Sequence, residues 1–174
     1  MNDKMTTKPK PIGRAMAFYI GVAALACGSA IAIAQSAAPD KSQSAAWHNQ
    51  QQIALSGLKA EDGWRYEDGG LMWRRVAGDG GGEKPALSDR VTVHYAGTLV
   101  DGTEFDSSYK RGEPATFPLG GLIPAWKMAI PKMAVGDKIE LAAPASLAYG
   151  PRGKGPIPGG ATLLFTVELL DIEE

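Results

Sequence analysis

Hydrophobic and polar residues alternate along several short stretches of the second half of the chain. In residues 91–99, Val91, Val93 and Tyr95 are separated by single polar residues, and this period of two predicts a β-strand with one buried face. Asp101-Gly102 follows this run and is a strong turn signal between extended segments. Further apolar runs predict strands over residues 71–76, 138–143 and 162–170.

Gly- and Pro-rich segments separate these strands and predict loops over residues 78–89 and 144–161. Residues 103–119 are expected to form an extended run and then a loop. One short helix is predicted within residues 123–133, because Pro124 suits the first turn of a helix and an apolar segment follows it. Four to six strands and one short helix indicate an α+β domain, in which an antiparallel sheet folds over the helix.

The first forty residues show a different pattern. Residues 1–14 carry four Lys or Arg and one Asp, residues 15–34 carry no charge, and the uncharged run ends in Ala32-Ile33-Ala34. These features describe a secretory signal peptide with a small-residue cleavage site, but twenty residues also suffice for a membrane span. A cleaved signal peptide and an uncleaved anchor therefore both remain open for residues 1–34. A third interpretation, lipidation at Cys27, is disfavoured because the apolar run continues past this residue.

Both interpretations of the leader place the rest of the chain outside the cytoplasm, since the basic flank precedes the apolar run. We therefore expect a location in the periplasm or cell envelope of a bacterium. Residues 35–63, rich in Ser, Ala, Gln and Asn, are interpreted as a spacer before a folded domain at residues 64–174. A short helix is compatible with residues 47–60 although its apolar pattern is thin, and a loose contact is favoured for Trp47 over a membrane-interface anchor.

The composition is that of a globular protein and argues against several classes of function. The 174 residues are 44% hydrophobic and 21% charged, close to ordinary globular values. A net charge of −1 argues against a nucleic-acid-binding protein, which usually has a basic face. One cysteine and two histidines argue against an internal disulfide framework and a thiolate zinc cluster. We expect no cofactor and no metal.

Motifs for nucleotide binding and nucleophilic catalysis are poorly supported. The clusters GDGGGE and GPRGKG lack the spacings of phosphate-binding loops, and the sequence contains no G-x-S-x-G nucleophile motif. What remains is a high density of aromatic and branched residues near turns: Tyr95, Phe105, Phe117, Leu122, Ile123, Trp126, Tyr149, Ile157 and Phe165. Most aromatic residues of a small β-domain belong to its core. Tyr149 and Phe105, however, stand beside turns, and Phe105 precedes Asp106, which suggests the rim of a binding site.

Five segments resemble, in order and spacing, the FKBP-type peptidyl-prolyl cis-trans isomerases: VHYAGTLVDGTEFDSS, LIPAW, SLAYG, GPIP and TLLFTVELLDI. The resemblance covers about residues 70–172 and is closest to the bacterial envelope branch that includes the macrophage infectivity potentiator proteins. It implies a twisted antiparallel sheet of about five strands curled around one short helix, with an apolar cup between them. The chain departs from the family pattern at Ala125, where glycine is usual, and at Gly159-Gly160, a pair expected to leave its loop flexible.

The resemblance also implies the residues of the site. Trp126 would form the floor of the cup, and its walls would be Tyr95, Phe105, Phe117, Leu122, Ile123, Ile157 and Phe165. Asp106 would be the rim carboxylate, Tyr149 would offer its hydroxyl to a substrate carbonyl, and Ile123 would offer a backbone N–H. Asp106, Tyr149 and Trp126 are thus the expected catalytic residues. Asp106 is expected to orient and stabilise rather than act as a base; a local cap or a salt bridge to Arg111 is its alternative role.

The implied activity is non-covalent acceleration of Xaa-Pro rotation in folding envelope proteins, without a cofactor. The expected partners are proline-containing polypeptides and macrolide inhibitors such as rapamycin. We expect no nucleic acid, membrane contact only through the N-terminal segment, and a monomeric chain. The main alternative is a non-enzymatic periplasmic holdase chaperone that uses the same pocket. A membrane scaffold protein that assembles through residues 35–63 is a second alternative.

Overall fold

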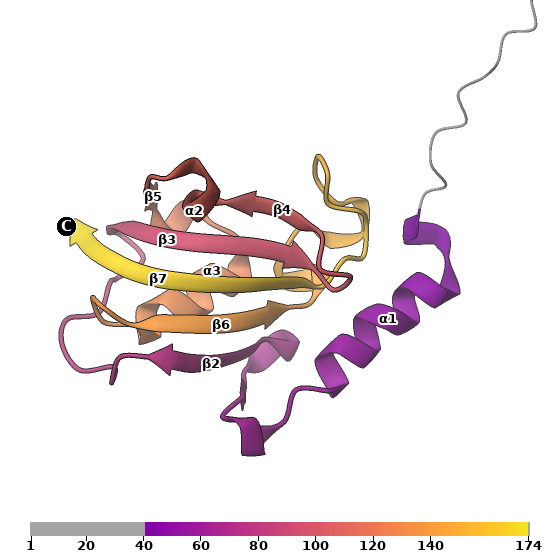
Figure 1. Ribbon diagram of the computed structural model, residues 1–174, viewed down its shortest axis with the longest axis horizontal. Coiled ribbons are helices and arrows are strands. Elements are labelled where there is room, and N and C mark those ends of the chain that lie inside the picture. The colour runs from indigo at the N-terminus through magenta and orange to yellow at the C-terminus, as the bar shows by residue number, and fades with distance from the viewer. Residues whose placement is uncertain (1–40, 174) are drawn as a thin grey trace, which may run out of the picture. The chain divides into compact units, whose positions relative to one another are not determined.

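The computed structural model describes residues 41–173, and in this part of the chain seven strands form one antiparallel sheet (Figure 1). The strand order is β1-β2-β6-β7-β3-β4, and β5 also pairs with β3. The strands are β1 (Arg65–Tyr66), β2 (Met72–Ala77), β3 (Arg90–Leu99), β4 (Glu104–Ser107), β5 (Ala115–Pro118), β6 (Lys138–Ala143) and β7 (Leu163–Glu173). The expected α+β fold with an antiparallel sheet is confirmed. The sheet has seven strands where about five were expected, because β1, β4 and β5 are too short to show an alternating pattern.

Three α-helices accompany the sheet in the described part of the chain: α1 (Ala45–Ser56), α2 (Ser108–Arg111) and α3 (Pro124–Ala129). Short 3-10 turns occupy the connections: η1 (Lys41–Gln43), η2 (Ala60–Asp62), η3 (Asp68–Gly70), η4 (Leu119–Gly121), η5 (Ile130–Lys132), η6 (Ala145–Leu147) and η7 (Gly150–Arg152). Helix α3 lies behind β6 and β7 in the view of Figure 1. It is the short helix around which the sheet was expected to curl.

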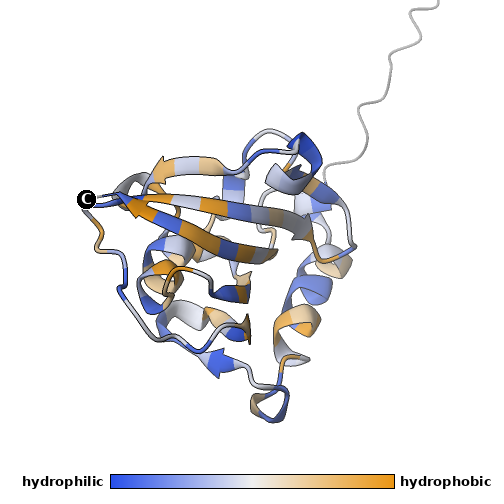
Figure 2. Ribbon diagram, turned by 60° about the vertical axis from the view of Figure 1, so that its left-hand side comes forward, coloured by the Kyte–Doolittle hydropathy of each residue, from blue (hydrophilic) through white to orange (hydrophobic). Residues whose placement is uncertain are grey.

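The alternation in β3 and β7 explains how the sheet packs on α3. Val93 of β3 and Val167 and Leu169 of β7 are fully buried, while the residues between them are partly exposed. Figure 2 accordingly shows the long strands banded in hydrophobic and hydrophilic colours. The register pairs Val93 with Leu169 and Tyr95 with Val167, so these side chains form one core with the buried residues of α3. Each such Val or Leu contributes about 1.5–3 kcal/mol on burial, which fixes the helix against the sheet.

The predicted elements agree with the structure where the pattern was periodic and differ elsewhere. The four predicted strands correspond to β2, β3, β6 and β7, with ends that differ by at most three residues. Helix α3 is shorter than the predicted range 123–133 and continues as η5, because Pro131 has no N–H with which to extend the α-helix. The segment 103–119 contains the helical turn α2 between β4 and β5, which was not predicted.

Helix α1 lies in the segment that was interpreted as a spacer. Ser44 caps its N-terminus, and the Ser44 Oγ accepts a hydrogen bond from the backbone N–H of Trp47 at 3.0 Å. The expectation of a loose contact for Trp47 is wrong, because this residue is only 3% exposed and belongs to the main core cluster. The thin apolar pattern of the helix thus reflects docking through one large aromatic side chain.

The leader at residues 1–34, with Cys27, lies outside the residues that the structure describes. In residues 41–173, no helix is both long and apolar enough to cross a membrane. The domain boundaries placed at residues 35 and 64 stay predictions.

Candidate active site

A cavity of about 350 Å³ opens among β3, β4, β7, α3 and the loop after β6. Nine of the ten site residues expected from the sequence line it, together with Gly121 and Lys154: Tyr95, Phe105, Asp106, Phe117, Leu122, Ile123, Trp126, Tyr149 and Phe165. The lining is therefore mostly aromatic and aliphatic, and its charged side chains are one carboxylate and one ammonium group. Such a cavity suits a small apolar group with a few polar contacts.

Trp126 lies at the centre of the aromatic side chains of this cavity. It is 4% exposed and meets Tyr95, Phe117 and Phe165 edge-on, with ring centroids 5.3, 6.2 and 5.5 Å away. Edge-to-face pairs of this kind contribute about 0.5–1.5 kcal/mol beyond their buried area. The indole is positioned by the start of α3, where the backbone N–H of Trp126 donates to the Ile123 carbonyl at 3.0 Å. The floor of the cavity is thus a rigid part of the core.

Gly97 of β3 makes room for the opposite wall. The rings of Phe105 and Phe165 pack edge-to-face at 5.6 Å, directly over this position. A Cβ on Gly97 would lie 2.5 Å from Cζ of Phe105 and 3.0 Å from Cε1 of Phe165, closer than carbon atoms pack. The glycine within the YAGT segment is therefore a requirement of the wall, and the sequence interpretation did not single it out.

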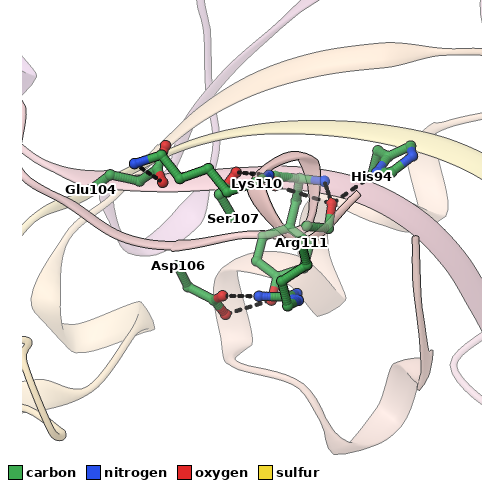
Figure 3. Close-up of polar contacts among 8 residues, drawn as sticks. His94, Glu104, Asp106, Ser107, Lys110 and Arg111 are labelled. Carbon is green, nitrogen blue, oxygen red and sulfur yellow. Dashed lines mark hydrogen bonds and ion pairs between the residues drawn. The ribbon is translucent and has the colours of Figure 1, made fainter. Parts of the chain in front are cut away.

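Asp106 stands at the rim in a hydrogen-bonded group with Tyr95 and Arg111. The Tyr95 hydroxyl donates to Oδ2 of Asp106 at 2.5 Å, and Nη1 of Arg111 pairs with Oδ1, as Figure 3 shows for Asp106 and Arg111. Nη2 of Arg111 also donates to the Tyr95 hydroxyl at 3.1 Å. The expected salt bridge to Arg111 is therefore present, and both carboxylate oxygens of Asp106 are occupied.

Helix α2 presents Arg111 to this group. The Ser107 Oγ caps the turn by accepting from the Lys110 N–H at 3.3 Å, and Gly112 ends it with a φ of 75°, a left-handed conformation that favours glycine. Lys110 pairs with Glu104 across the turn at 2.9 Å (Figure 3). The short turn is thus fixed at both ends, and Arg111 reaches back to β4.

The pKa values of this group keep Asp106 charged. Partial burial alone would raise the pKa of Asp106, but hydrogen bonds from Tyr95 and Arg111 and the charge of Arg111 outweigh it and hold the pKa below its usual range. Burial and the neighbouring carboxylate raise the pKa of Tyr95. Near neutral pH the acid is therefore ionised and its phenol partner protonated, an arrangement that orients groups and does not provide a free base.

The loop after β6 supplies Tyr149 and Lys154. Burial, and then the charge of Asp106, raise the pKa of Tyr149, so its hydroxyl stays protonated at neutral pH and can donate a hydrogen bond. The Lys154 Nζ lies 5.5 Å from the centroid of the Tyr149 ring, within cation–π range. The lysine was not predicted as a site residue; its one signal was its place in the Gly- and Pro-rich loop that carries Tyr149.

Ile157 and Ala125 lie outside the lining. Ile157 was expected as a wall; it is 7% exposed and forms an isolated bridge with Lys154, each N–H donating to the other carbonyl at 3.0 Å. Ala125, where the family usually has glycine, is fully buried, and its methyl group does not reach the cavity. Within residues 41–173 no group of three or more His, Cys, Asp or Glu side chains is arranged to hold a metal ion.

Comparisons with known proteins agree with this geometry. The family model described as "FKBP-type peptidyl-prolyl cis-trans isomerase" matches residues 81–170. The chain is 50% identical over 129 residues to the FKBP-type 22 kDa peptidyl-prolyl cis-trans isomerase of Escherichia coli, covering 70% of this chain and 62% of that protein. It is 48% identical over 120 residues to FkpA of Aeromonas hydrophila, covering 69% and 44%. It is 44% identical over 121 residues to the outer membrane protein MIP of Legionella longbeachae, covering 69% and 52%. The match therefore spans about half the length of these relatives.

Two solved structures extend the comparison. The crystal structure of FkpA from Escherichia coli superposes with a TM-score of 0.68 at 44% identity, over 72% of this chain and 58% of that one. A peptidyl-prolyl cis-trans isomerase from Pseudomonas syringae superposes with a TM-score of 0.67 at 31% identity, over 80% of this chain and 99% of that one. The second match is longer than residues 64–174 alone.

Proposed function

The chain belongs to the FKBP-type peptidyl-prolyl cis-trans isomerase family, and on this premise we propose that its cavity binds Xaa-Pro segments of polypeptides and accelerates rotation about the bond before proline. The observation that carries the proposal is the convergence of Trp126, Asp106 and Tyr149 on one apolar cavity. Asp106 reaches it from β4, Trp126 from α3, and Tyr149 from the loop after β6.

The proposed reaction requires only that the cavity bind the twisted form of the amide. Amide resonance opposes rotation with a barrier of roughly 18–20 kcal/mol, and the two Xaa-Pro isomers are otherwise close in energy. The twisted transition state has lost this resonance, so its carbonyl is less polarised than that of the planar amide. A site that binds the proline ring and the twisted carbonyl better than the planar substrate lowers the barrier. A reduction of about 4 kcal/mol corresponds to roughly a thousandfold acceleration.

Polar groups at the cavity would then fix the twisted carbonyl. The Tyr149 hydroxyl stays protonated, as the raised pKa indicates, and hydrogen-bonds to no other described residue. The Ile123 carbonyl accepts the first bonds of α3, while the N–H of this N-cap residue lies outside the bonding of the helix. We assign Asp106 an orienting and electrostatic role, because both its oxygens are engaged.

Turnover of a proline tetrapeptide tests the activity. The unmodified chain should accelerate isomerisation, Trp126→Ala should lower kcat/KM about a hundredfold, and Asp106→Ala should lower it less. Trp64→Ala is the matched control, because Trp64 does not line this cavity. Absence of turnover in the folded, unmodified chain would overturn the proposal. If that chain still delayed aggregation of an unfolded protein, the holdase function would replace it.

Macrolides of the rapamycin class are the proposed inhibitors, because a rigid apolar ring system fits the same aromatic floor. Titration with rapamycin should change the tryptophan fluorescence of the chain, and the change should disappear in Trp126→Phe. The chain has four tryptophans, so this variant identifies the reporting residue. Saturating ligand without any spectral change in the unmodified chain would contradict the assignment of the cavity.

Residues 1–34 are proposed to direct export, so that the domain acts on polypeptides in the periplasm or cell envelope. The support is the basic and then apolar leader pattern, together with a relative named as an outer membrane protein. Mass spectrometry of the N-terminus in expressing bacteria distinguishes cleavage near Ala34 from an intact anchor. We also propose a monomeric chain, which sedimentation of the exported protein would test.

A further inference from the structure

The loop between β6 and β7 has few internal hydrogen bonds, although Ile157 and Ala161 are buried in the core cluster. It supplies Tyr149 and Lys154 to the cavity, yet beyond its two 3-10 turns its internal bonds are the Lys154–Ile157 bridge and a bond from the Gly160 N–H to the Gly150 carbonyl at 3.0 Å. A segment with so few internal bonds depends for its conformation on contacts from outside the loop, with the core and with α1.

Helix α1 supplies polar contacts of this kind through Trp47 and Gln51. The indole Nε1 of Trp47 donates to the Gly159 carbonyl at 3.2 Å. The Gln51 Oε1 accepts from the Thr162 N–H at 2.8 Å, and its Nε2 donates to the Trp47 carbonyl at 3.3 Å. Both side chains are 3% exposed. In Figure 1, α1 lies at the end of the sheet where β6 ends and β7 begins.

The Gly159-Gly160 pair makes this close approach possible. A Cβ on Gly159 would lie 2.0 Å from the Pro151 carbonyl oxygen and 3.3 Å from Cβ of Ser42. A Cβ on Gly160 would lie 3.1 Å from Cε1 of His48, and Gly160 has a φ of 73°. The pair was expected to leave the loop flexible. In the structure its missing side chains let η7 and α1 pack directly on the loop backbone.

We infer that Trp47 and Gln51 are positioning residues, which hold the loop so that Tyr149 and Lys154 stay at the cavity; the inference rests on the function proposed above. Without α1, each binding event would have to order the loop, and that entropic cost weakens binding. With α1 docked, the loop is ordered before the substrate arrives.

Two substitutions of glutamine in the full chain test this role. Gln51→Leu removes the acceptor of the buried Thr162 N–H, and Gln52→Leu places the same leucine at the exposed neighbouring position. Hydrogen exchange should quicken in peptides covering residues 145–161 of Gln51→Leu only, with peptides from β3 unchanged. The KM for a proline tetrapeptide should rise about fivefold, with kcat changed less.

Trp47→Phe provides an independent check if Gln51→Leu fails to fold. It keeps a buried ring and removes the bond to Gly159, so loop exchange and KM should rise in the same direction. Equal loop exchange in Gln51→Leu and Gln52→Leu would overturn the inference, as would faster exchange with an unchanged KM. If the unmodified chain is inactive, the proposed function fails, and loop exchange alone decides whether α1 holds the loop.

Discussion

The two sides of the cavity are held in place by different kinds of contact. Trp126, Phe105 and Phe165 belong to α3 and to strands of the sheet, and they pack on one another within the core. Tyr149 and Lys154 belong to a loop that rests on two side chains of α1. The first side depends on many short contacts among neighbours. The second depends on a few contacts between residues that are far apart in the sequence: Gln51 with Thr162, and Trp47 with Gly159.

This difference separates stability from function in the two regions. A substitution in the aromatic wall removes core packing, so it should lower the free energy of unfolding together with activity. A substitution that changes only the Tyr149 hydroxyl or the exposed Lys154 leaves the core intact, so it should change binding and turnover with little effect on unfolding. The predictions below test this separation.

Gly97→Ala should have the largest effect, because it acts on the wall. The added methyl would overlap the Phe105 ring at 2.5 Å, and overpacking of this kind costs about 1–3 kcal/mol of unfolding free energy. Urea denaturation measures the loss, and tetrapeptide turnover should fall with it as Phe105 is displaced. Gly57→Ala is the control, because the nearest atom to its Cβ lies at 3.4 Å. An unchanged unfolding free energy in Gly97→Ala would contradict this prediction, because it would mean that the Phe105 ring can move aside without cost.

Tyr149→Phe should affect turnover and leave stability unchanged. It keeps the ring and removes the hydroxyl proposed to bind the substrate carbonyl, a loss of about 1 kcal/mol for one hydrogen bond, or about fivefold in kcat/KM. The unfolding free energy should stay within about 0.5 kcal/mol of the unmodified chain. Tyr109→Phe removes a hydroxyl bonded to Glu168 outside the cavity and serves as the control. Equal turnover in both variants would remove Tyr149 from the mechanism.

Asp106→Asn tests the hydrogen-bonded group of Asp106, Tyr95 and Arg111 through the pH dependence of the unfolding free energy. A carboxyl whose pKa is lowered on folding stabilises the fold above its unfolded pKa, and this contribution is lost as the pH falls through the folded value. Because Asp106 is 43% exposed, solvent screening limits the contribution to about 1 kcal/mol or less. The unmodified chain should exceed Asp106→Asn in unfolding free energy at pH 7, and the difference should shrink as the pH falls below about 3.9, the unperturbed Asp pKa, and through the lowered folded value. A difference independent of pH would exclude this origin.

The same division separates what the sequence could and could not predict. The period-two pattern located β3 and β7, because strands with one buried face must alternate. The pattern alone suggested only Phe105, Asp106 and Tyr149 as the rim of a site, and the other lining residues were assigned through the resemblance to the family. Helix α2 has four residues, too few for a helical period. The docking of α1 rests on one Trp and one Gln, and a buried Gln gives no hydrophobic signal.

The smallest expected effect concerns Lys154 and the choice of substrate by the loop. Its ammonium group is exposed beside the Tyr149 ring, while Asp106, the other charged residue of the lining, is already paired with Arg111. We therefore expect an acidic residue beside the proline to be favoured over a basic one. Lys154→Glu should shift the kcat/KM ratio of Glu-Pro to Lys-Pro peptides about threefold towards Lys-Pro, as for an exposed ion pair. The shift should shrink as salt is raised.

Lys84→Glu makes the same charge change away from the cavity and should leave the ratio unchanged. If the two variants behaved alike, the effect would come from net charge, and the loop would have no part in choosing substrates.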